Sequence, residues 1–253
     1  MKVSIITAVL NGAATLEDCL SSVRQQTHVD REHIIIDGGS TDRTLEIIKR
    51  NGDDIVRWVS EPDEGIYDAM NKGIALASGD VVGILNADDF YADAHVLSKV
   101  AAVFDDVSID SCYGDLEYVD PMDTHRVIRH WHAGQYNKHC FYWGWMPPHP
   151  TFFARRRIYE EQGPFNPSLG SAADYELMLR FLLKQMIRTF YIPAVLIKMR
   201  IGGKSNASLR NRIRANLMDR QAWRINGLTP YPWTLYCKPL RKIGQYFFSG
   251  RSL

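Results

Sequence analysis

The chain has 253 residues, of which 45% are hydrophobic, 23% charged and 11% aromatic, so a disordered or fibrous protein is excluded and one large domain with an extension is expected. Its formal net charge is +1, but the segment from residue 198 onward holds twelve Lys or Arg and a single acidic residue, which leaves an acidic body with a basic tail. The acidic body argues against a nucleic-acid partner, and four cysteines without CxxC spacing argue against a zinc ribbon or a disulfide framework.

The N-terminal third alternates between short apolar runs of β character and helical patterns. Leu16, Cys19, Leu20 and Val23 recur at the i, i+3, i+4, i+7 spacing of an amphipathic helix. Neither a G-x-G-x-x-G turn nor a P-loop follows the first strand. Alternation with short turns predicts a parallel sheet flanked by helices. Strands are expected at residues 3–9, 33–36, 55–59 and 81–85, and helices at 16–23, 45–51 and 66–77.

Two adjacent acids, Asp88 and Asp89, directly follow the buried run 81–85. Open α/β sheets bind ligands at the carboxyl ends of their strands, and neighbouring carboxylates need a cation or hydrogen-bond donors to stay ionised. Ligation by oxygen alone suits Mg²⁺ or Mn²⁺. The pair therefore predicts a metal–nucleotide site, with a solvated turn as the alternative. Asp37 ends the second strand at the same edge. Its carboxylate could accept hydrogen bonds from a base or from ribose hydroxyls, or it could cap the next turn.

The alternation fails after residue 89. Strands are expected at 111–116 and 127–131, the second antiparallel to its neighbour. The segment 131–153 is dense in aromatic residues, which could line a sugar or lipid pocket or pack under a long loop. His149 lies between two prolines that fix its backbone, so it is either a placed donor or ligand or a structural residue. Asp174, in the first turn of a helix that begins at 173, is either a general base or an acid stabilised by the helix dipole.

β character resumes at residues 191–199 and is followed by a Gly-rich basic loop, 200–206. Backbone N–H groups and Lys204 of this loop could close over phosphates. From Tyr231 onward the chain mixes aromatic and basic side chains, which suits a membrane interface with anionic lipids or a tail docked on the body. No leader pattern and no apolar run near 18 residues is found, so a cytoplasmic protein is expected.

Several blocks of the sequence, taken in order, match a known enzyme family. Four blocks cover residues 3–11, 35–44, 60–73 (SEPDEGIYDAMNKG) and 85–89 (LNADD). Three shorter blocks, at 149–153, 173–176 and 202–205, extend the match. Through these blocks the chain resembles the family 2 glycosyltransferases of GT-A fold, and among them the bacterial enzymes that build exopolysaccharide and colanic-acid-like repeat units.

The resemblance implies transfer of a sugar from a nucleoside diphosphate donor to an acceptor hydroxyl, with inversion. It places Thr7, Asp37 and Asp63 near the base of the donor. It also places Asp88 at the ribose or donor sugar, and Asp89 on a divalent metal, Mn²⁺ or Mg²⁺, that binds the diphosphate. The family often carries Asp-x-Asp where this chain has Ala-Asp-Asp, so either acid remains open as the metal ligand.

The resemblance also implies roles on the other side of the scissile bond. Asp174 matches the family's catalytic base, although Ala173 stands where an acid usually precedes it. A base at this position would take the proton of the acceptor hydroxyl during in-line attack. Lys204 together with the metal would neutralise the charge on the departing diphosphate. His149 and Trp145 are the expected acceptor-binding residues.

We therefore expect an α/β protein of GT-A fold, a Rossmann-like α/β/α sandwich with a mostly parallel sheet and a basic, helical C-terminal extension. Residues 1–115 would form the nucleotide-sugar-binding half, 116–205 the acceptor-binding and catalytic half, and 206–253 the extension. The expected activity is transfer of a sugar with inversion, and a UDP sugar is the favoured donor. The expected acceptor is a saccharide linked to a polyprenyl diphosphate at the inner face of the plasma membrane. The alternatives are a sugar nucleotidyltransferase, whose Gly-rich, Arg-containing N-terminal loop is missing, and a non-catalytic nucleotide-sugar-binding protein.

Overall fold

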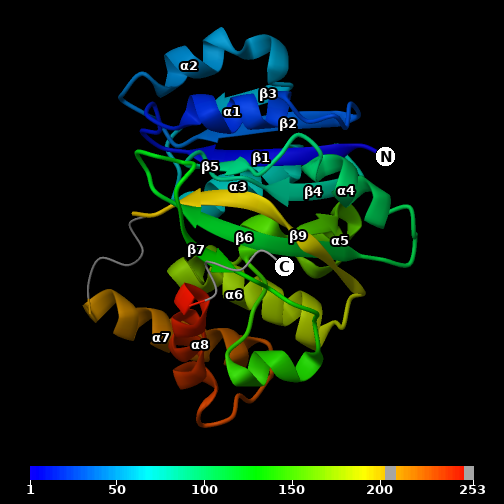
Figure 1. Ribbon diagram of the computed structural model, residues 1–253, viewed down its shortest axis with the longest axis vertical. Coiled ribbons are helices and arrows are strands. Elements are labelled where there is room, and N and C mark those ends of the chain that lie inside the picture. The colour runs from blue at the N-terminus through cyan, green and yellow to red at the C-terminus, as the bar shows by residue number, and fades with distance from the viewer. Residues whose placement is uncertain (203–208, 248–253) are drawn as a thin grey trace.

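A nine-stranded mixed sheet forms the body of the computed structural model, which describes residues 1–202 and 209–247 (Figure 1). The strand order is β3-β2-β1-β4-β8-β6-β9-β5, and β7 pairs with β6. The strands are β1 (Val3–Val9), β2 (Arg31–Asp37), β3 (Arg57–Ser60), β4 (Val81–Ile84), β5 (Asp89–Tyr91), β6 (Ser111–Val119), β7 (Val127–Trp131), β8 (Phe153–Arg155) and β9 (Thr189–Arg200). The helices are α1 (Leu16–Arg24), α2 (Thr44–Arg50), α3 (Ile66–Leu76), α4 (Val96–Val103), α5 (Arg156–Gln162), α6 (Ala173–Met178), α7 (Leu209–Ile225) and α8 (Thr234–Phe247).

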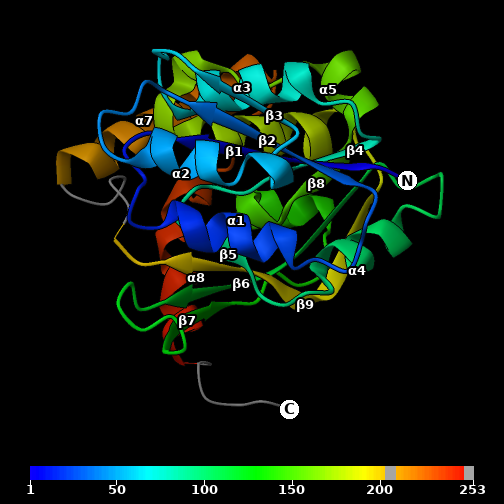
Figure 2. The ribbon, with the colours of Figure 1, turned by 90° about the horizontal axis from the view of Figure 1, so that it is seen from above.

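The first four strands form the parallel part of the sheet that the alternating sequence pattern predicted. β1 pairs in parallel with β2 and with β4, and β2 pairs in parallel with β3. Every residue of β1 and β4 is buried because helices cover both faces, with α3 on one side and α1 on the other (Figure 2). Successive side chains alternate between these faces, so Ile6 joins the core under α3 and Ile5 the core under α1. The buried residues of α1 are the four that the spacing predicted: Leu16, Cys19, Leu20 and Val23.

The remaining strands form a second, mixed part of the same sheet. β8 is antiparallel to β4 and to β6, β9 is parallel to β6, and β5 is antiparallel to β9. The expected antiparallel pairing of β7 with β6 is confirmed. β9 continues through Pro193, where its register against Gly114 and Asp115 shifts. Because β6 runs across residues 115 and 116, the two halves expected from the sequence share one continuous sheet.

The connection from β4 to β5 requires the sheet to curl. Four strand spacings separate β4 from β5, or about 19 Å in a flat sheet. Five Cα steps join Ile84 to Asp89 and would span about 18 Å only if fully extended. The loop turns instead, since Asp89 N donates to Asn86 O at 3.0 Å. The far edge of the sheet therefore curves back over the end of β4, where β5 contacts α1.

The C-terminal helices α7 and α8 dock on the body beside α6 (Figure 1). Trp223 of α7 is fully buried, and its Nε1 donates to the hydroxyl of Tyr175 at 3.0 Å. Lys238 of α8 pairs with Asp219 of α7 at 2.7 Å. The tail from Tyr231 onward thus contacts the body through α8, as the docked-tail alternative expected, and whether it also binds a membrane stays a prediction. Among residues 1–202 and 209–247, none of the helices combines the length and apolar character that crossing a bilayer needs.

Candidate active site

Three loops meet at the carboxyl edge of β1, β2 and β4. Asn11 adopts a left-handed conformation with φ of 53°, and its Oδ1 accepts hydrogen bonds from Thr41 N at 2.8 Å and Asp42 N at 3.3 Å. Asn tolerates this conformation better than most residues. The next residue, Gly12, lies against Ala87, since a Cβ on Gly12 would stand 3.6 Å from the Ala87 Cβ. The loop after β1 thus joins the loops after β2 and β4 into one edge.

Two acids expected at the base, Asp37 and Asp63, lie at the end of β2 and in the loop that follows β3. Asp37 is fully buried and accepts hydrogen bonds from Ser60 Oγ at 2.7 Å and Ser40 N at 3.1 Å. Asp63 lies against the residue that follows Asp37, because a Cβ on Gly38 would stand only 2.3 Å from Asp63 Oδ2. The lack of a side chain at Gly38 therefore makes room for the Asp63 carboxylate next to the chain that follows Asp37.

The side chain of Thr7 does not reach this edge. Thr7 is fully buried in β1, and its hydroxyl lies 2.9 Å from His33 Nε2 and 3.7 Å from Cys19 Sγ. These two partners lie in the interior, on the side of the sheet that α1 covers, so the Thr7 hydroxyl points away from the edge. The expected contact of the Thr7 side chain with a donor base is therefore wrong.

The twin acids differ in exposure. Asp89 is fully buried as the first residue of β5, whereas Asp88 is the one residue of the loop 86–89 that is not buried. Burial, and then the charge of Asp88, raise the pKa of Asp89 well above its ordinary range, while Asn86 and Arg200 act in the opposite direction. Asn86 Nδ2 donates to Asp89 Oδ2 at 3.2 Å. Asp89 is thus a buried acid whose charged form needs a compensating partner.

The donor atoms of this loop fit a divalent cation. Asn86 Oδ1 and Asp89 Oδ1 are buried without a hydrogen-bond partner, and buried polar atoms in that condition are rare. Together with the more accessible carboxylate of Asp88, they make this an oxygen-only donor set, which is the preference of Mg²⁺ and Mn²⁺. A cation here would also offset the like charges of the two acids.

Arg200 anchors the acidic loop from the end of β9. Its Nη1 donates to the backbone oxygen of Asp88 at 2.8 Å, and its Nη2 pairs with Asp18. The guanidinium also lies 5.0 Å from the centre of the Phe90 ring, and only 8% of the side chain is exposed. Arg200 opens the loop expected to cover phosphates, and the Lys204 of that loop lies outside the described residues.

Asp174 lies between His149 and Tyr67 on the other wall of the site. Asp174 Oδ2 is 3.2 Å from His149 Nδ1, and Asp174 Oδ1 accepts a hydrogen bond from Tyr175 N at 2.7 Å. Burial lowers the pKa of His149 against the opposing effect of Asp174, so the neutral ring can donate Nδ1–H to the carboxylate. Burial, and then the charge of Asp174, raise the pKa of the Tyr67 hydroxyl, which stays protonated. Two residues predicted separately, His149 and Asp174, are thus brought together.

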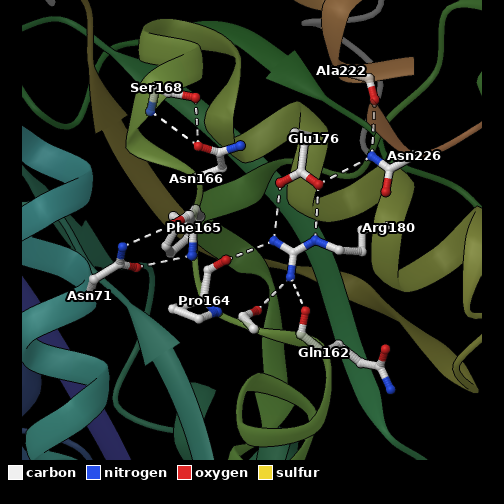
Figure 3. Close-up of polar contacts among 11 residues, drawn as sticks. Asn71, Gln162, Pro164, Phe165, Asn166, Ser168, Glu176, Arg180, Ala222 and Asn226 are labelled. Atoms are coloured by element: carbon white, nitrogen blue, oxygen red, sulfur yellow. Dashed lines mark hydrogen bonds and ion pairs between the residues drawn. The ribbon is translucent and has the colours of Figure 1, made fainter. Parts of the chain in front are cut away.

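Arg180 holds the helix that carries Asp174 (Figure 3). Its five N–H donors are all used, because a guanidinium offers five and the structure gives it five acceptors. They are Glu176 Oε1 at 2.9 Å, Glu176 Oε2 at 3.0 Å, Gly163 O at 2.6 Å, Pro164 O at 2.7 Å and the oxygen of Gln162. Asn226, which directly follows α7, completes the set by donating to Glu176 at 3.1 Å. The network joins α6 to the end of α5 and to α7.

Asn71 links α3 to the same region (Figure 3). Its side chain donates to Phe165 O at 2.9 Å and accepts from Phe165 N at 3.0 Å. The rings of Tyr67 and Phe165 lie 5.3 Å apart. Because Tyr67 follows Asp63 at the start of α3, these contacts fix the base-side loop to the segment that leads into α6.

Trp145 is a core residue. It is 4% exposed, and its Nε1 donates to Ala133 O at 2.7 Å. Its ring contacts those of Phe141 at 5.4 Å and Tyr136 at 5.7 Å. A ring covered in this way has no free face for a sugar, so the expected acceptor contact of Trp145 is wrong.

Sequence reasoning missed two residues of the site, Tyr67 and Arg200. Tyr67 lies within the block 60–73 that carried the family resemblance, so a signal for it was present. Arg200 was seen only as part of a basic loop. Its contact with Asp88, 112 residues away, depends on the β5–β9 pairing.

The mixed sheet and the acids at its edge define an α/β protein with a candidate metal-binding loop, and sequence comparison gives the family. The sequence profile described as Glycosyl transferase family 2 matches residues 4–163. A PGL/p-HBAD biosynthesis glycosyltransferase of Mycobacterium bovis (strain BCG / Pasteur 1173P2) is 33% identical over 207 residues, covering 80% of this chain and 78% of that protein. An uncharacterized glycosyltransferase of Mycobacterium tuberculosis is 32% identical over 189 residues, with 72% and 69% covered. The chain belongs to glycosyl transferase family 2.

Solved structures share its fold. The S. aureus TarS 1-349 complex with UDP-GlcNAc superimposes with a TM-score of 0.69 at 16% identity, covering 99% of this chain and 74% of that one. The mannosyltransferase PcManGT from Pyrobaculum calidifontis, in complex with GDP-Man and Mn²⁺, gives a TM-score of 0.65 at 19% identity, with 99% and 76% covered. The expected GT-A fold is confirmed.

Proposed function

We propose that the chain is an inverting glycosyltransferase that moves a sugar from a nucleoside diphosphate sugar to a hydroxyl of a saccharide acceptor. The observation that supports this proposal is the series of contacts from the base-side acids to a candidate base. Asp63 lies against Gly38, the residue after Asp37, and α3 begins three residues after Asp63 and carries Tyr67, which lies against Asp174. The groups proposed to bind the donor and to accept the proton are therefore linked through the start of α3.

On the donor side, Asp37 and Asp63 would accept hydrogen bonds from the N–H edge of the base. UDP is the favoured carrier, in keeping with the UDP and UDP-GlcNAc complexes of TarS. A divalent ion, Mn²⁺ or Mg²⁺, would neutralise charge on the departing diphosphate when bound. Lys204 would add a positive charge to the same group.

We propose that Asp88 is the main ligand of the metal and that Asp89 Oδ1 and Asn86 Oδ1 would face the same ion from the buried side. Asp88 is the more accessible of the two acids, whereas Asp89 is fully buried under the β5–β9 ladder. Asp89 would then support the loop through Asn86, and Arg200 would hold the backbone of Asp88 in place.

On the acceptor side, Asp174 would take the proton of the attacking hydroxyl. His149 and Tyr67 contact its carboxylate, and His149 would also contact the acceptor. One base acting on one attacking hydroxyl gives a single displacement, which inverts the anomeric carbon. Because the base acts only in the transition state, its loss should lower turnover and leave donor affinity nearly unchanged.

The first experiment identifies the donor and tests the base. Nucleoside diphosphate sugars are screened by thermal shift with and without Mn²⁺, since a ligand at one hundred times its Kd stabilises the native state by about 2.7 kcal/mol. Release of nucleoside diphosphate is then measured with saccharide and lipid-linked acceptors. Asp174→Asn should lower turnover about 10²- to 10⁴-fold while the donor Kd stays nearly constant. Asp105→Asn, an exposed acid near the end of α4, serves as the control.

A parallel loss of donor affinity in Asp174→Asn would contradict its role as base. Retention of the anomeric configuration in the product, read by proton NMR, would contradict the single displacement. For the metal, Asp88→Asn should abolish the Mn²⁺-dependent part of the thermal shift and Asp89→Asn should reduce it. A larger loss in Asp89→Asn than in Asp88→Asn would make Asp89 the main ligand, as the family resemblance implied.

We further propose that the acceptor is linked to a polyprenyl diphosphate and that the enzyme works at the inner face of the plasma membrane. An exposed aromatic patch supports this placement, with Trp143 53%, Tyr231 44%, Trp233 45% and Tyr236 61% exposed. Trp143 and Trp233 lie 5.9 Å apart and Tyr231 and Trp233 5.1 Å apart, so three of the four rings form one group. Exposed Arg241 on α8 adds a positive charge. Aromatic rings and basic side chains are the combination that binds the headgroup region of anionic membranes.

Co-sedimentation with vesicles that contain anionic lipid tests this placement. The Trp143→Ala, Trp233→Ala double variant should bind vesicles more weakly than the wild type. Trp58→Ala is the matched control, because Trp58 is 40% exposed on the edge strand β3, away from the patch. Equal binding of all three proteins would refute the placement.

A further inference from the structure

A second cluster of potential metal ligands lies on β6 and β7, and it shares no residue with the site described above. Asp115 lies on β6, His130 lies on β7, and His132 directly follows the last residue of β7. Figure 1 shows the two strands side by side. One donor atom from each of the three lies within 4.8 Å of the others. His132 Nδ1 is 3.0 Å from Asp115 Oδ2, and His130 Nε2 is 3.7 Å from the same oxygen.

The strand geometry aims these three side chains at one point. Residues two apart in an extended segment share a face, and His132 stands two residues after His130 where β7 ends, so the two rings lie on the same side as Asp115. The register pairs Glu117 with His130, which brings the neighbouring Asp115 onto that side of β6. In a tetrahedral site with bonds of about 2.0–2.1 Å, ligand atoms stand about 3.3 Å apart. The two measured separations, 3.0 and 3.7 Å, lie on either side of that value.

The atoms not aimed at this point are held by a second set of contacts. Asp115 Oδ1 accepts hydrogen bonds from Ala133 N and from the Tyr191 hydroxyl, each at 2.8 Å, so Oδ2 remains for a ligand. Glu117 Oε1 lies 3.5 Å from His130 Nδ1, which leaves Nε2 of that ring for a ligand. A carboxylate behind a histidine is the usual support for a metal-bound imidazole.

We propose that Asp115, His130 and His132 bind a divalent transition-metal ion of the zinc class. Two imidazoles and one carboxylate suit Zn²⁺, Co²⁺ or Ni²⁺, whereas the oxygen-only loop at Asp88 suits Mg²⁺ or Mn²⁺. The site is open to solvent on the His132 side, where 69% of the side chain is exposed. The fourth coordination position there would hold water or an oxygen of a bound molecule. The two metal sites therefore differ in donor chemistry as well as in place.

The test uses the full chain, purified without a polyhistidine tag and stripped of metal with a chelator. Zn²⁺ is titrated by calorimetry, and Co²⁺ by its visible absorption, which reports a low-symmetry nitrogen–oxygen site. The wild type should bind one equivalent. His132→Ala should abolish this binding, and its fold should be unaffected because the side chain is mostly exposed. Glu117→Gln should weaken binding about 10- to 100-fold, as loss of a supporting carboxylate does.

Two control variants make the result specific. His125→Ala removes an exposed histidine from the turn of the same β6–β7 hairpin and should leave Zn²⁺ affinity unchanged. Asp88→Asn should also leave it unchanged, because the donor loop is a separate site. Failure of the wild type to bind one equivalent, equal binding by His132→Ala, or loss of Zn²⁺ binding in Asp88→Asn would each overturn the proposal. In the first of these outcomes the three residues form only an ion-paired cluster.

Discussion

Replacing Arg180 with Met should test how strongly the helix of Asp174 is held. The side chains of Arg180 and Glu176 are 13% and 3% exposed, so the substitution leaves Glu176 charged and buried without its cation. It also leaves the carbonyls of residues 162, 163 and 164 without these donors. Breaking a buried ion pair from one side costs about 3–5 kcal/mol, while Met retains most of the packing of the Arg stem. At about 2–4 °C per kcal/mol for a chain of this size, the Tm should fall by about 6–20 °C.

Urea unfolding followed by circular dichroism measures the free energy, and a double variant separates the charge from the hydrogen bonds. Glu176→Gln combined with Arg180→Met removes the buried charge and should recover part of the loss. Arg50→Met is the matched control, because its pair with Glu17 is 68% and 45% exposed and should contribute about 1 kcal/mol or less. A cost for Arg180→Met no larger than that for Arg50→Met would refute the reasoning.

Three other predictions rest on single positions. Burial holds the pKa of His33 at about 3 against an ordinary 6.5, so in acid the unfolded chain takes up a proton that the native state does not, and stability falls as pH falls. Between pH 7.5 and 5.5 the wild type should lose about 1.4 kcal/mol more than His33→Gln in urea titrations, and equal losses would disprove this account. Gly83→Ala should destabilise the fold by about 1–3 kcal/mol, since its Cβ would stand 2.2 Å from a ring carbon of Phe153, whereas Gly52→Ala, with no atom within 4 Å, should change stability by less than about 0.5 kcal/mol. Gly38→Ala should displace the adjoining Asp63 and raise the donor Kd about tenfold or more by calorimetry, with an unchanged Kd arguing against a role for that carboxylate.

The parallel part of the fold could be read from the sequence because its strands are buried on both faces. Runs such as 3–9 and 81–85 are mostly apolar and buried along their whole length for that reason. β5 gave no such signal, since it is three residues long and begins with an acid. Its partner β9 lies more than a hundred residues away, and no local pattern specifies a pairing of that range. The curl of the sheet was therefore beyond sequence reasoning.

The kinds of residue in the candidate site could be predicted from the sequence, but their arrangement in space could not. Asp37 was singled out because an acid at the end of a parallel strand lies at the ligand edge, and Asp174 because it matches the base of the family. The approach of His149 to Asp174 brings the turn before β8 against the start of α6, and no local sequence pattern specifies that contact. Trp145 was misread because aromatic density looks the same in a core as in a sugar platform.

The return of the far sheet edge over β4 gives the loop 85–88 a mechanical role. The loop is the covalent tie between two strands that lie four places apart in the sheet, and Arg200 fastens it again from β9. A donor bound at this loop would restrain β4 in the centre of the sheet and β5 at its edge at the same time. Amide hydrogen exchange in β5 and β9 should then slow together with that in β4 when donor binds, so that opening of the two regions becomes one collective motion.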